Sequence, residues 1–188
     1  MLPAFTETIA VVFAVAYVIL AIRQNIFCWF AAILSSSLYV LLFYEAGLYM
    51  ISILQFVYIA MGIYGWRSWR KENHKGMKLR VSSWPLAFHF LPIIFILSMA
   101  FIIGMLLQVF SSAVFPFLDS FVACTALIAV WLVAKKVIQN WHYWFIADAV
   151  SVYIFVNQGL WPTVSLYILY MALCPVGYRT WSKDLKIS

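Results

Sequence analysis

Seven long apolar segments follow one another along the chain, and they limit the possible folds more than any other feature. At about 20 residues for each bilayer crossing, seven helices would use about 140 of the 188 residues. Because 66% of the residues are hydrophobic and 10% are charged, a secreted disulfide scaffold, a cytosolic enzyme, a disordered tail and a nucleic-acid-binding domain are excluded. We expect an all-α polytopic membrane protein. The expected helices cover approximately residues 4–22, 26–44, 48–66, 87–109, 116–134, 140–157 and 160–178.

The basic residues give an independent test of this number of helices. With seven spans, the first, third and fifth loops and the C-terminal segment lie on the same side of the membrane. All 12 Lys and Arg residues fall in those segments. The positive-inside rule therefore predicts a cytoplasmic C-terminus and an outside N-terminus. The basic stretch 67–80 can contact anionic lipid heads, and the first segment, which lacks a basic leader, is expected to be retained as a helix.

The first three and the last three helices resemble each other in sequence. Two G-[WY]-R-x-W boxes, at 65–69 and 177–181, lie 112 residues apart. Earlier in each half the matches lie 115 residues apart, which a three-residue difference in length would explain; they pair Gln24-Asn25, Trp29-Phe30 and Ser36 with Gln139-Asn140, Trp144-Phe145 and Ser151. We expect a 3+1+3 parallel repeat: residues 1–69, a basic loop and linker helix over 70–111, and residues 112–188. Parallel repeats build transporters with a substrate site near the bilayer midplane.

One carboxylate lies deep in a predicted span. Asp148 is nine residues into the sixth helix, roughly 13 Å along its axis, where a charge costs about 2.5–3.5 kcal/mol on insertion scales. No Lys or Arg lies within the spans to pair with it. It is either a structural Asp, hydrogen-bonded to neighbouring helices or protonated, or the partner of a cationic or donor-rich ligand.

The neighbours of Asp148 favour a ligand. Trp141, Trp144, Asp148 and Ser151 are spaced 3, 4 and 3 residues apart and share one helix face. Indole rings attract cations and stack on flat rings, so this face suits a flat, positively charged heteroaromatic molecule. Trp141 could equally be an anchor at the membrane interface.

Two further helices carry polar residues at helical spacing. In the third helix, Gln55, Tyr58 and Gly62 share a face, and Tyr167, Tyr170 and Cys174 occupy the equivalent positions in the seventh. A buried amide usually forms a hydrogen bond across helices, so Gln55 could bind either another helix or a ligand. We expect these tyrosines and Gln55 to complete a substrate site.

The remaining aromatic and sulfur-containing residues have plainer interpretations. Tryptophans near the helix ends are expected to be interfacial belt residues; they are Trp66, Trp69, Trp84, Trp161 and Trp181. The three cysteines are expected to be small buried hydrophobic residues. Catalytic motifs such as H-E-x-x-H and G-x-S-x-G do not occur. We therefore expect neither an enzyme nor a bound cofactor or metal.

Three motifs in combination resemble the Pnu-type vitamin transporters over nearly the whole chain. They are Gln55-x-x-Tyr58-x-x-x-Gly62-Ile63-Tyr64-Gly65-Trp66-x-x-Trp69, Pro116-Phe117-x-Asp119-Ser120, and Asn140-Trp141-x-x-Trp144 with Ser151-Val152. The resemblance implies a fold similar to that of the SWEET sugar transporters and a place in the bacterial cytoplasmic membrane. It also implies facilitated diffusion of a dephosphorylated vitamin, which a cytoplasmic kinase then traps by phosphorylation. Substrates in the family are nicotinamide riboside, thiamine and, in a relative, riboflavin.

The sequence departs from this family at one position that bears on the substrate. Nicotinamide riboside transporters look like W-x-x-W-x-x-x-N, whereas the last position here is Asp148. An ionised carboxylate only accepts hydrogen bonds, so it suits the cationic ring and amino donor of thiamine. We therefore expect thiamine, as in the PnuT group, with nicotinamide riboside as the alternative.

Several alternatives stay open at this stage. An Asp could also meet ribose hydroxyls, and proton coupling through Asp148 is compatible with the sequence, as is a homo-oligomer. A non-transporting membrane scaffold would have a dry, aliphatic repeat interface, whereas a transporter would have an aromatic-lined cavity. A sugar carrier is disfavoured because a sugar needs no carboxylate paired against a cation.

Overall fold

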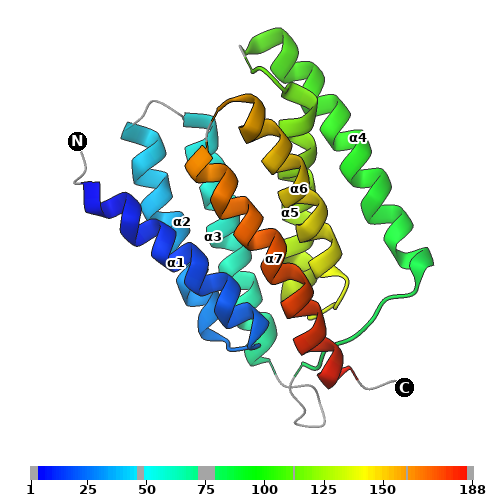
Figure 1. Ribbon diagram of the computed structural model, residues 1–188. Helices are drawn as coiled ribbons and strands as arrows, with labels where there is room; N and C mark the ends of the chain where they lie inside the picture. The colour runs from blue at the N-terminus through cyan, green and yellow to red at the C-terminus, as the bar shows by residue number, and fades with distance from the viewer. Residues whose placement is uncertain (1–3, 46–48, 72–78, 112, 160, 186–188) are drawn as a thin grey trace. The chain divides into compact units, whose positions relative to one another are not determined.

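The computed structural model describes residues 4–45, 49–71, 79–111, 113–159 and 161–185, and this part of the chain contains seven helices (Figure 1). They are α1 (Ala4–Ile22), α2 (Phe27–Glu45), α3 (Tyr49–Arg70), α4 (Leu86–Phe110), α5 (Pro116–Ala134), α6 (Asn140–Asn157) and α7 (Trp161–Asp184). Each predicted segment coincides with one helix. The largest difference is at the end of α7, which continues six residues past its predicted end at 178.

The apolar character of the helices is uneven. Within the described residues, three helices are long and apolar enough to cross a membrane by length and composition alone; they cover Phe5–Ile22, Leu86–Phe110 and Pro116–Ala134. A shorter apolar stretch, Phe27–Leu42, lies in α2. The all-helical membrane fold is thus supported most directly by α1, α4 and α5.

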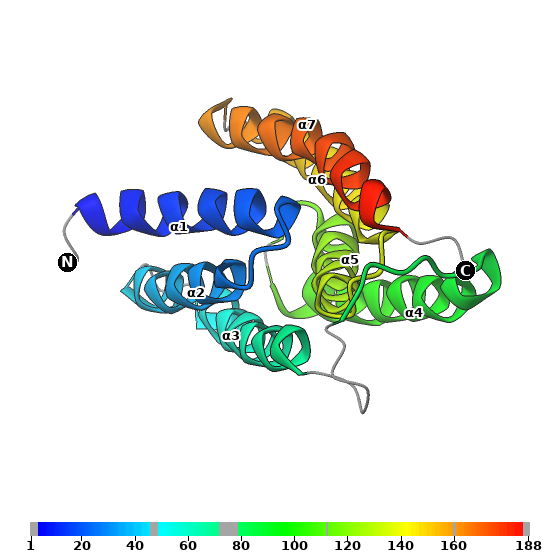
Figure 2. The same cartoon turned by 90° about the horizontal axis from the view of Figure 1, so that it is seen from below.

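The chain divides into two compact units. Unit 1 consists of Met1–Arg80 and Val133–Lys136, and unit 2 consists of Val81–Leu132 and Val137–Ser188. In unit 1, α2 packs against both α1 and α3; Figure 2 shows these three helices from below. In unit 2, α6 packs against α7. The division into residues 1–69, 70–111 and 112–188 stays a prediction.

Side-chain hydrogen bonds hold unit 1 together at two levels. The Ser35 hydroxyl on α2 donates to the carbonyl oxygen of Ala10 on α1 over 2.9 Å. Where α3 ends, the Trp69 indole N–H donates to the Val133 carbonyl over 3.1 Å, and the Ser68 hydroxyl donates to Ala134 over 2.9 Å. These bonds satisfy carbonyls that the end of α5 leaves without intrahelical partners.

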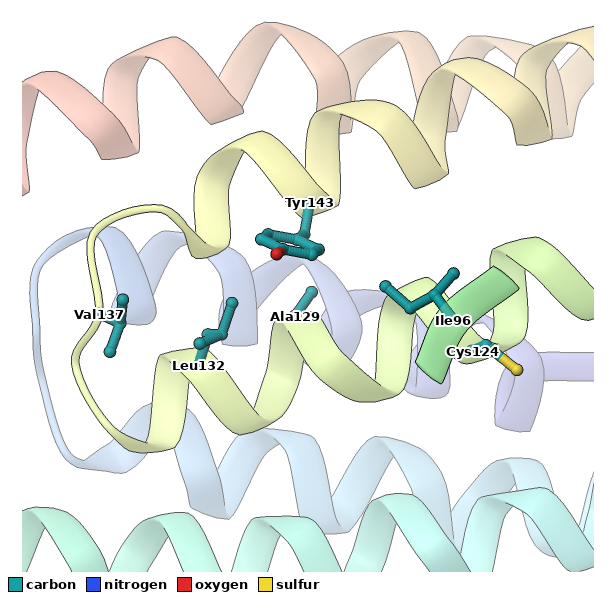
Figure 3. Close-up of a cluster of buried hydrophobic side chains, with 6 residues drawn as sticks. All are labelled: Ile96, Cys124, Ala129, Leu132, Val137 and Tyr143. Atoms are coloured by element: carbon teal, nitrogen blue, oxygen red, sulfur yellow. The ribbon is translucent and has the colours of Figure 1, made fainter. Parts of the chain in front are cut away.

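Unit 2 is built around a hydrophobic cluster between α4, α5 and α6. The cluster consists of Ile96, Cys124, Ala129, Leu132, Val137 and Tyr143 (Figure 3). The segment before α4 is fixed to the turn before α6, because the Ile138 N–H donates to the Ser82 carbonyl and the Gln139 amide donates to the Trp84 carbonyl, both over 2.9 Å. Next to the cluster, His89 Nδ1 on α4 and the Tyr143 hydroxyl on α6 are within hydrogen-bond distance, 3.0 Å apart. These contacts tie α4 to α6.

The turns after α1 and after α5 have the same backbone geometry. Gln24 and Lys136 each have a φ of 53°, in the left-handed region that side chains other than Gly rarely adopt. The Gln24 N–H donates to Ala21 over 3.0 Å, and the Lys136 N–H donates to Val133 over 2.9 Å. These matching residues are 112 positions apart, so the repeat register predicted for this region, 115 residues, is wrong.

The two buried tryptophans that follow these turns, Trp29 and Trp141, are also 112 residues apart. Trp29 lies edge-on to Trp69, with ring centroids 5.4 Å apart and planes at 86°. Trp141 lies edge-on to Trp181 at 5.6 Å and 86°. A three-residue slip is close to one 3.6-residue turn, so the incorrect register still aligned residues on nearly the same helix face. In the correct register Asp148 corresponds to Ser36.

The indole rings of Trp29 and Trp141 each pack against a glycine of the next helix. A Cβ atom added to Gly65 would overlap the ring of Trp29, and one added to Gly177 would overlap the ring of Trp141. The expectation that Trp69 and Trp181 are belt residues is therefore wrong, since they are only 6% and 0% exposed. In the pattern Gly-x-x-x-Trp the glycine and the tryptophan lie on the same helix face, one turn apart. The glycine leaves a gap on that face, and an indole ring from the preceding helix fills it.

Candidate substrate-binding site

Asp148 lies buried on α6 with very little to neutralise it. Its side chain is 4% exposed. Within the described residues its carboxylate makes one side-chain hydrogen bond, from the Cys174 Sγ on α7 to Oδ2, over a long 3.9 Å. A carboxylate has about four acceptor positions, and a buried charge is costly unless it is paired. Within the described residues, most of the acceptor positions of this carboxylate therefore have no hydrogen-bond donor.

The other predicted residues of α6 divide between two surroundings. Ser151 is buried, and its hydroxyl donates to the Ala147 carbonyl one turn earlier over 2.9 Å. Trp144 is half-buried and packs against the hydrophobic cluster of unit 2. Trp141 is 4% exposed and packs on α7. The single stripe predicted from spacing thus holds one packing indole, one half-accessible indole and two buried polar groups.

Trp141 and Trp29 share an uncommon feature. The indole N–H of each is buried and has no hydrogen-bond partner among the residues that the structure describes. Because Trp29 occupies the matching position in unit 1, the burial of Trp141 follows from the packing common to the two units.

A cleft opens between α6 and α7 next to Asp148. Its volume is about 220 Å³, and it is lined by Trp141, His142, Phe145, Cys174, Pro175, Tyr178 and Arg179. Small-molecule sites usually enclose about 300–1,000 Å³, so this cleft is too small to hold a vitamin by itself. Cys174 both lines the cleft and contacts Asp148.

The contact of Cys174 with Asp148 was not predicted from the sequence. Cys174 was interpreted as a small buried hydrophobic residue, and like Cys28 and Cys124 it is indeed buried. The signal that could have identified it was its position on the same face of the seventh helix as Tyr167 and Tyr170.

The predicted tyrosines of α7 form a small aromatic group. The rings of Tyr167 and Tyr170 are 5.8 Å apart and edge-on, and Tyr167 is 5.2 Å from Phe155 on α6. Both tyrosines are half-buried. Edge-on and tilted pairs of this kind give rigid surfaces on which a flat ring can stack.

Gln55 and Tyr58 belong to α3 in unit 1, and both are half-buried. Their spacing keeps them on one face, one turn apart.

A bundle of apolar helices with a buried acid beside aromatic rings is typical of a membrane transport protein. The comparisons with known proteins agree: the chain belongs to the nicotinamide mononucleotide transporter family, whose profile matches residues 4–183. Two transporters named for nicotinamide riboside are similar to this chain: the PnuC proteins of Escherichia coli (strain K12) and Shigella flexneri. Each is 27% identical in an alignment of 187 positions, and the match covers 86% of this chain and 78% of the relative.

A more distant relative and a solved structure extend this result. The riboflavin/roseoflavin transporter RibM of Streptomyces davaonensis is 23% identical over 132 residues, covering 68% of this chain and 61% of RibM. The crystal structure of the vitamin B3 transporter PnuC has the same fold, with a TM-score of 0.77 at 18% identity over 97% of this chain and 82% of that one. The protein is therefore a multi-pass membrane protein of a family that includes transporters of small vitamins.

Proposed function

We propose that this protein takes up thiamine across the bacterial cytoplasmic membrane by facilitated diffusion. The substrate binds in an alternating-access cycle, and a cytoplasmic kinase traps it by phosphorylation. The N-terminus lies outside and the C-terminus lies in the cytoplasm, as the one-sided distribution of the 12 basic residues favours.

The observation that carries this proposal is the state of Asp148. Its carboxylate is buried, and a single long thiol contact is its only hydrogen bond within the described residues. A cationic ring with an amino donor supplies both the charge and the hydrogen bond that this group lacks. Thiamine has both features.

The aromatic residues supply the stacking surfaces in this proposal. The ring of the vitamin stacks on Trp144 and on one or more of Tyr58, Tyr167 and Tyr170, because these side chains are only half-buried. Asp148, Gln55 and Ser151 fix its polar groups. Trp141, although on the same predicted stripe, holds α6 against α7 and forms the edge of the site.

The helix arrangement proposed for transport is a 3+1+3 parallel repeat similar to that of SWEET transporters. The matching turns at Gln24 and Lys136, and the matching tryptophan pairs that follow them, support a repeat of α1–α3 in α5–α7. In this cycle the two three-helix repeats move relative to each other around the vitamin. The proposal needs no cofactor, and it is compatible with a homo-oligomer.

Nicotinamide riboside is the second candidate substrate. It is favoured by the 27% identity to two transporters named for that compound. Its pyridinium ring is also flat and cationic, so it fits the same indole and carboxylate. The residue at position 148 distinguishes the two candidates, because an Asn there would lose the charge and gain a donor.

Uptake by proteoliposomes tests the proposal. Purified protein is reconstituted, and entry of radiolabelled thiamine and nicotinamide riboside is measured for the wild type and for Asp148→Asn. Because hydrogen bonds to a charged group contribute about 1.5–3 kcal/mol, we expect thiamine uptake to fall about tenfold or more. Nicotinamide riboside uptake should change less or rise.

Asp119→Asn is the matched control, since it makes the same acid-to-amide change at a half-buried position near the start of α5. It should leave the ratio of the two uptake rates unchanged. Full thiamine uptake by Asp148→Asn would show that the substrate assignment is wrong. A wild type that moves neither vitamin above empty liposomes would refute the function itself.

A further inference from the structure

The matching positions around Asp148 differ sharply between the two units. In unit 1 the corresponding pair is Ser36 and Gly62, whereas in unit 2 it is Asp148 and Cys174. The acid and the thiol are thus a feature of the second repeat alone. They are also in contact, at 3.9 Å, although they come from different helices.

The space around this pair differs in the same way. In unit 1, Ile33 covers Gly62 so closely that an added Cβ would lie 2.6 Å from the Ile33 Cγ1. At the matching position in unit 2, Phe145 is 42% exposed and lines the cleft between α6 and α7. Cys174 therefore occupies space that an aliphatic side chain fills in unit 1.

These observations define what Cys174 can do. Its thiol is the one hydrogen-bond donor to the Asp148 side chain within the described residues. Cys174 also lines the cleft, and Asp148 is not among the residues that line it. A carboxylate rotates freely about its terminal bond unless a partner fixes it, and a functional group must be held in its productive geometry by neighbouring contacts.

We propose that Cys174 is a positioning residue. Its thiol orients the Asp148 carboxylate toward the cationic substrate and thereby raises the affinity of the transporter for that substrate. This inference rests on the proposed function of Asp148 as the substrate's partner. Cys174 acts through Asp148 and does not touch the substrate.

The first test separates substrate binding from the transport cycle. Cys174→Ala removes the donor. Because a thiol is a weak donor, its loss should cost no more than an ordinary hydrogen bond, about 0.5–1.5 kcal/mol. The KM for thiamine in proteoliposomes should therefore rise about two- to twelvefold, with the maximal rate nearly unchanged. Cys174→Ser, which restores a donor, should recover most of the affinity.

Cys124→Ala is the matched control. Cys124 is equally buried in unit 2 but belongs to the hydrophobic cluster, so its loss should leave the KM unchanged. An unchanged KM in a folded Cys174→Ala variant would overturn the proposal. So would a Cys174→Ser variant that folds and yet fails to recover affinity.

The second test needs no substrate. Infrared spectra are recorded in a Cys28→Ala, Cys124→Ala background, in which Cys174 is the only thiol. Replacing the acceptor by Asp148→Ser, the residue of unit 1, should move the S–H stretching band to higher frequency. An unmoved band would overturn the inference. If the wild type carries neither vitamin, the proposed function fails, and the infrared result alone decides whether Cys174 holds the carboxylate.

Discussion

Helices α1–α3 and helices α5–α7 share several packing features and differ where chemistry is expected. Each has a left-handed turn, an indole on a glycine, and a second indole edge-on to the first. Between these fixed points, unit 1 has Ser36 with Ile33 packed on Gly62, and unit 2 has an acid, a thiol and a cleft. The comparison teaches that the indole and glycine positions maintain packing, which leaves neighbouring positions free to differ.

The strongest way to break this comparison is to remove its large side chains. Trp29→Ala and Trp141→Ala should each destabilise the protein by about 3–5 kcal/mol, the usual loss for a buried Trp. Unfolding in detergent micelles, followed by circular dichroism, measures both. Trp161→Ala is the control, since Trp161 is 63% exposed and should cost little. A large loss at Trp29 with almost none at Trp141 would mean that the two indoles do not have equivalent roles.

A smaller effect is expected from filling the two glycine gaps. Gly65→Ala and Gly177→Ala each place a methyl group against an aromatic ring, and such overpacking costs about 1–3 kcal/mol. The same unfolding experiment measures the loss. Gly62→Ala should cost less, because the added methyl group meets one atom of Ile33 closer than 3.0 Å, whereas at Gly65 and at Gly177 it meets three atoms of an indole ring. If Gly62→Ala were the most damaging of the three, the scaffold would be centred elsewhere.

The contact between α4 and α6 offers a third test, because unit 1 has no tyrosine at the matching position. Tyr143 corresponds to Ala31 in unit 1, and its hydroxyl is 3.0 Å from His89 Nδ1. Tyr143→Phe should cost about 1 kcal/mol, as is typical for one hydrogen bond. Thermal unfolding measures the loss. Adding His89→Phe to the Tyr143→Phe variant should cause little further loss from this hydrogen bond, because the bond is already absent. Full additivity of the two losses would exclude this bond as their common cause.

The least disruptive test makes unit 2 more like unit 1. Phe145→Ile introduces the residue found at the matching position in unit 1. Because the aromatic ring that lines the cleft is lost, we expect the reaction of Cys174 with a small neutral methanethiosulfonate to become severalfold faster. Folding stability should change little, because Phe145 is partly exposed. Mass spectrometry of the labelled protein follows Cys174 against buried Cys124. Unchanged labelling would show that Phe145 does not control access to the cleft.

The course of the helices could be predicted from the sequence because apolar segments and polar breaks alternate along the chain. That Asp148 would be a buried acid could also be predicted, since a lone acid stands out in an apolar helix. The tryptophans were harder. Trp69 and Trp181 lie near helix ends, where hydropathy does not distinguish an interfacial ring from one that a glycine-lined gap receives.

The register of the repeat could not be obtained from matching pairs of residues alone. Gln24-Asn25 and Gln139-Asn140 look alike in sequence. The backbone conformation nevertheless makes Lys136 the equivalent of Gln24, although the two residues differ in chemistry. The contact of Cys174 with Asp148 was also beyond the sequence, because it depends on how α6 and α7 pack. Residue spacing predicts which residues share a face of one helix, but it does not predict which residues of a neighbouring helix that face contacts.

The shared left-handed turn has a consequence for how this chain tolerates change. Neither Gln24 nor Lys136 is glycine, so each position has kept a conformation that most side chains resist. In a library of all single substitutions, Gly and Asn should be accepted at both sites, whereas Val, Ile and Thr should be rejected at both. Two positions without chemical likeness would then accept the same substitutions, which would be evidence that the two turns have a common origin.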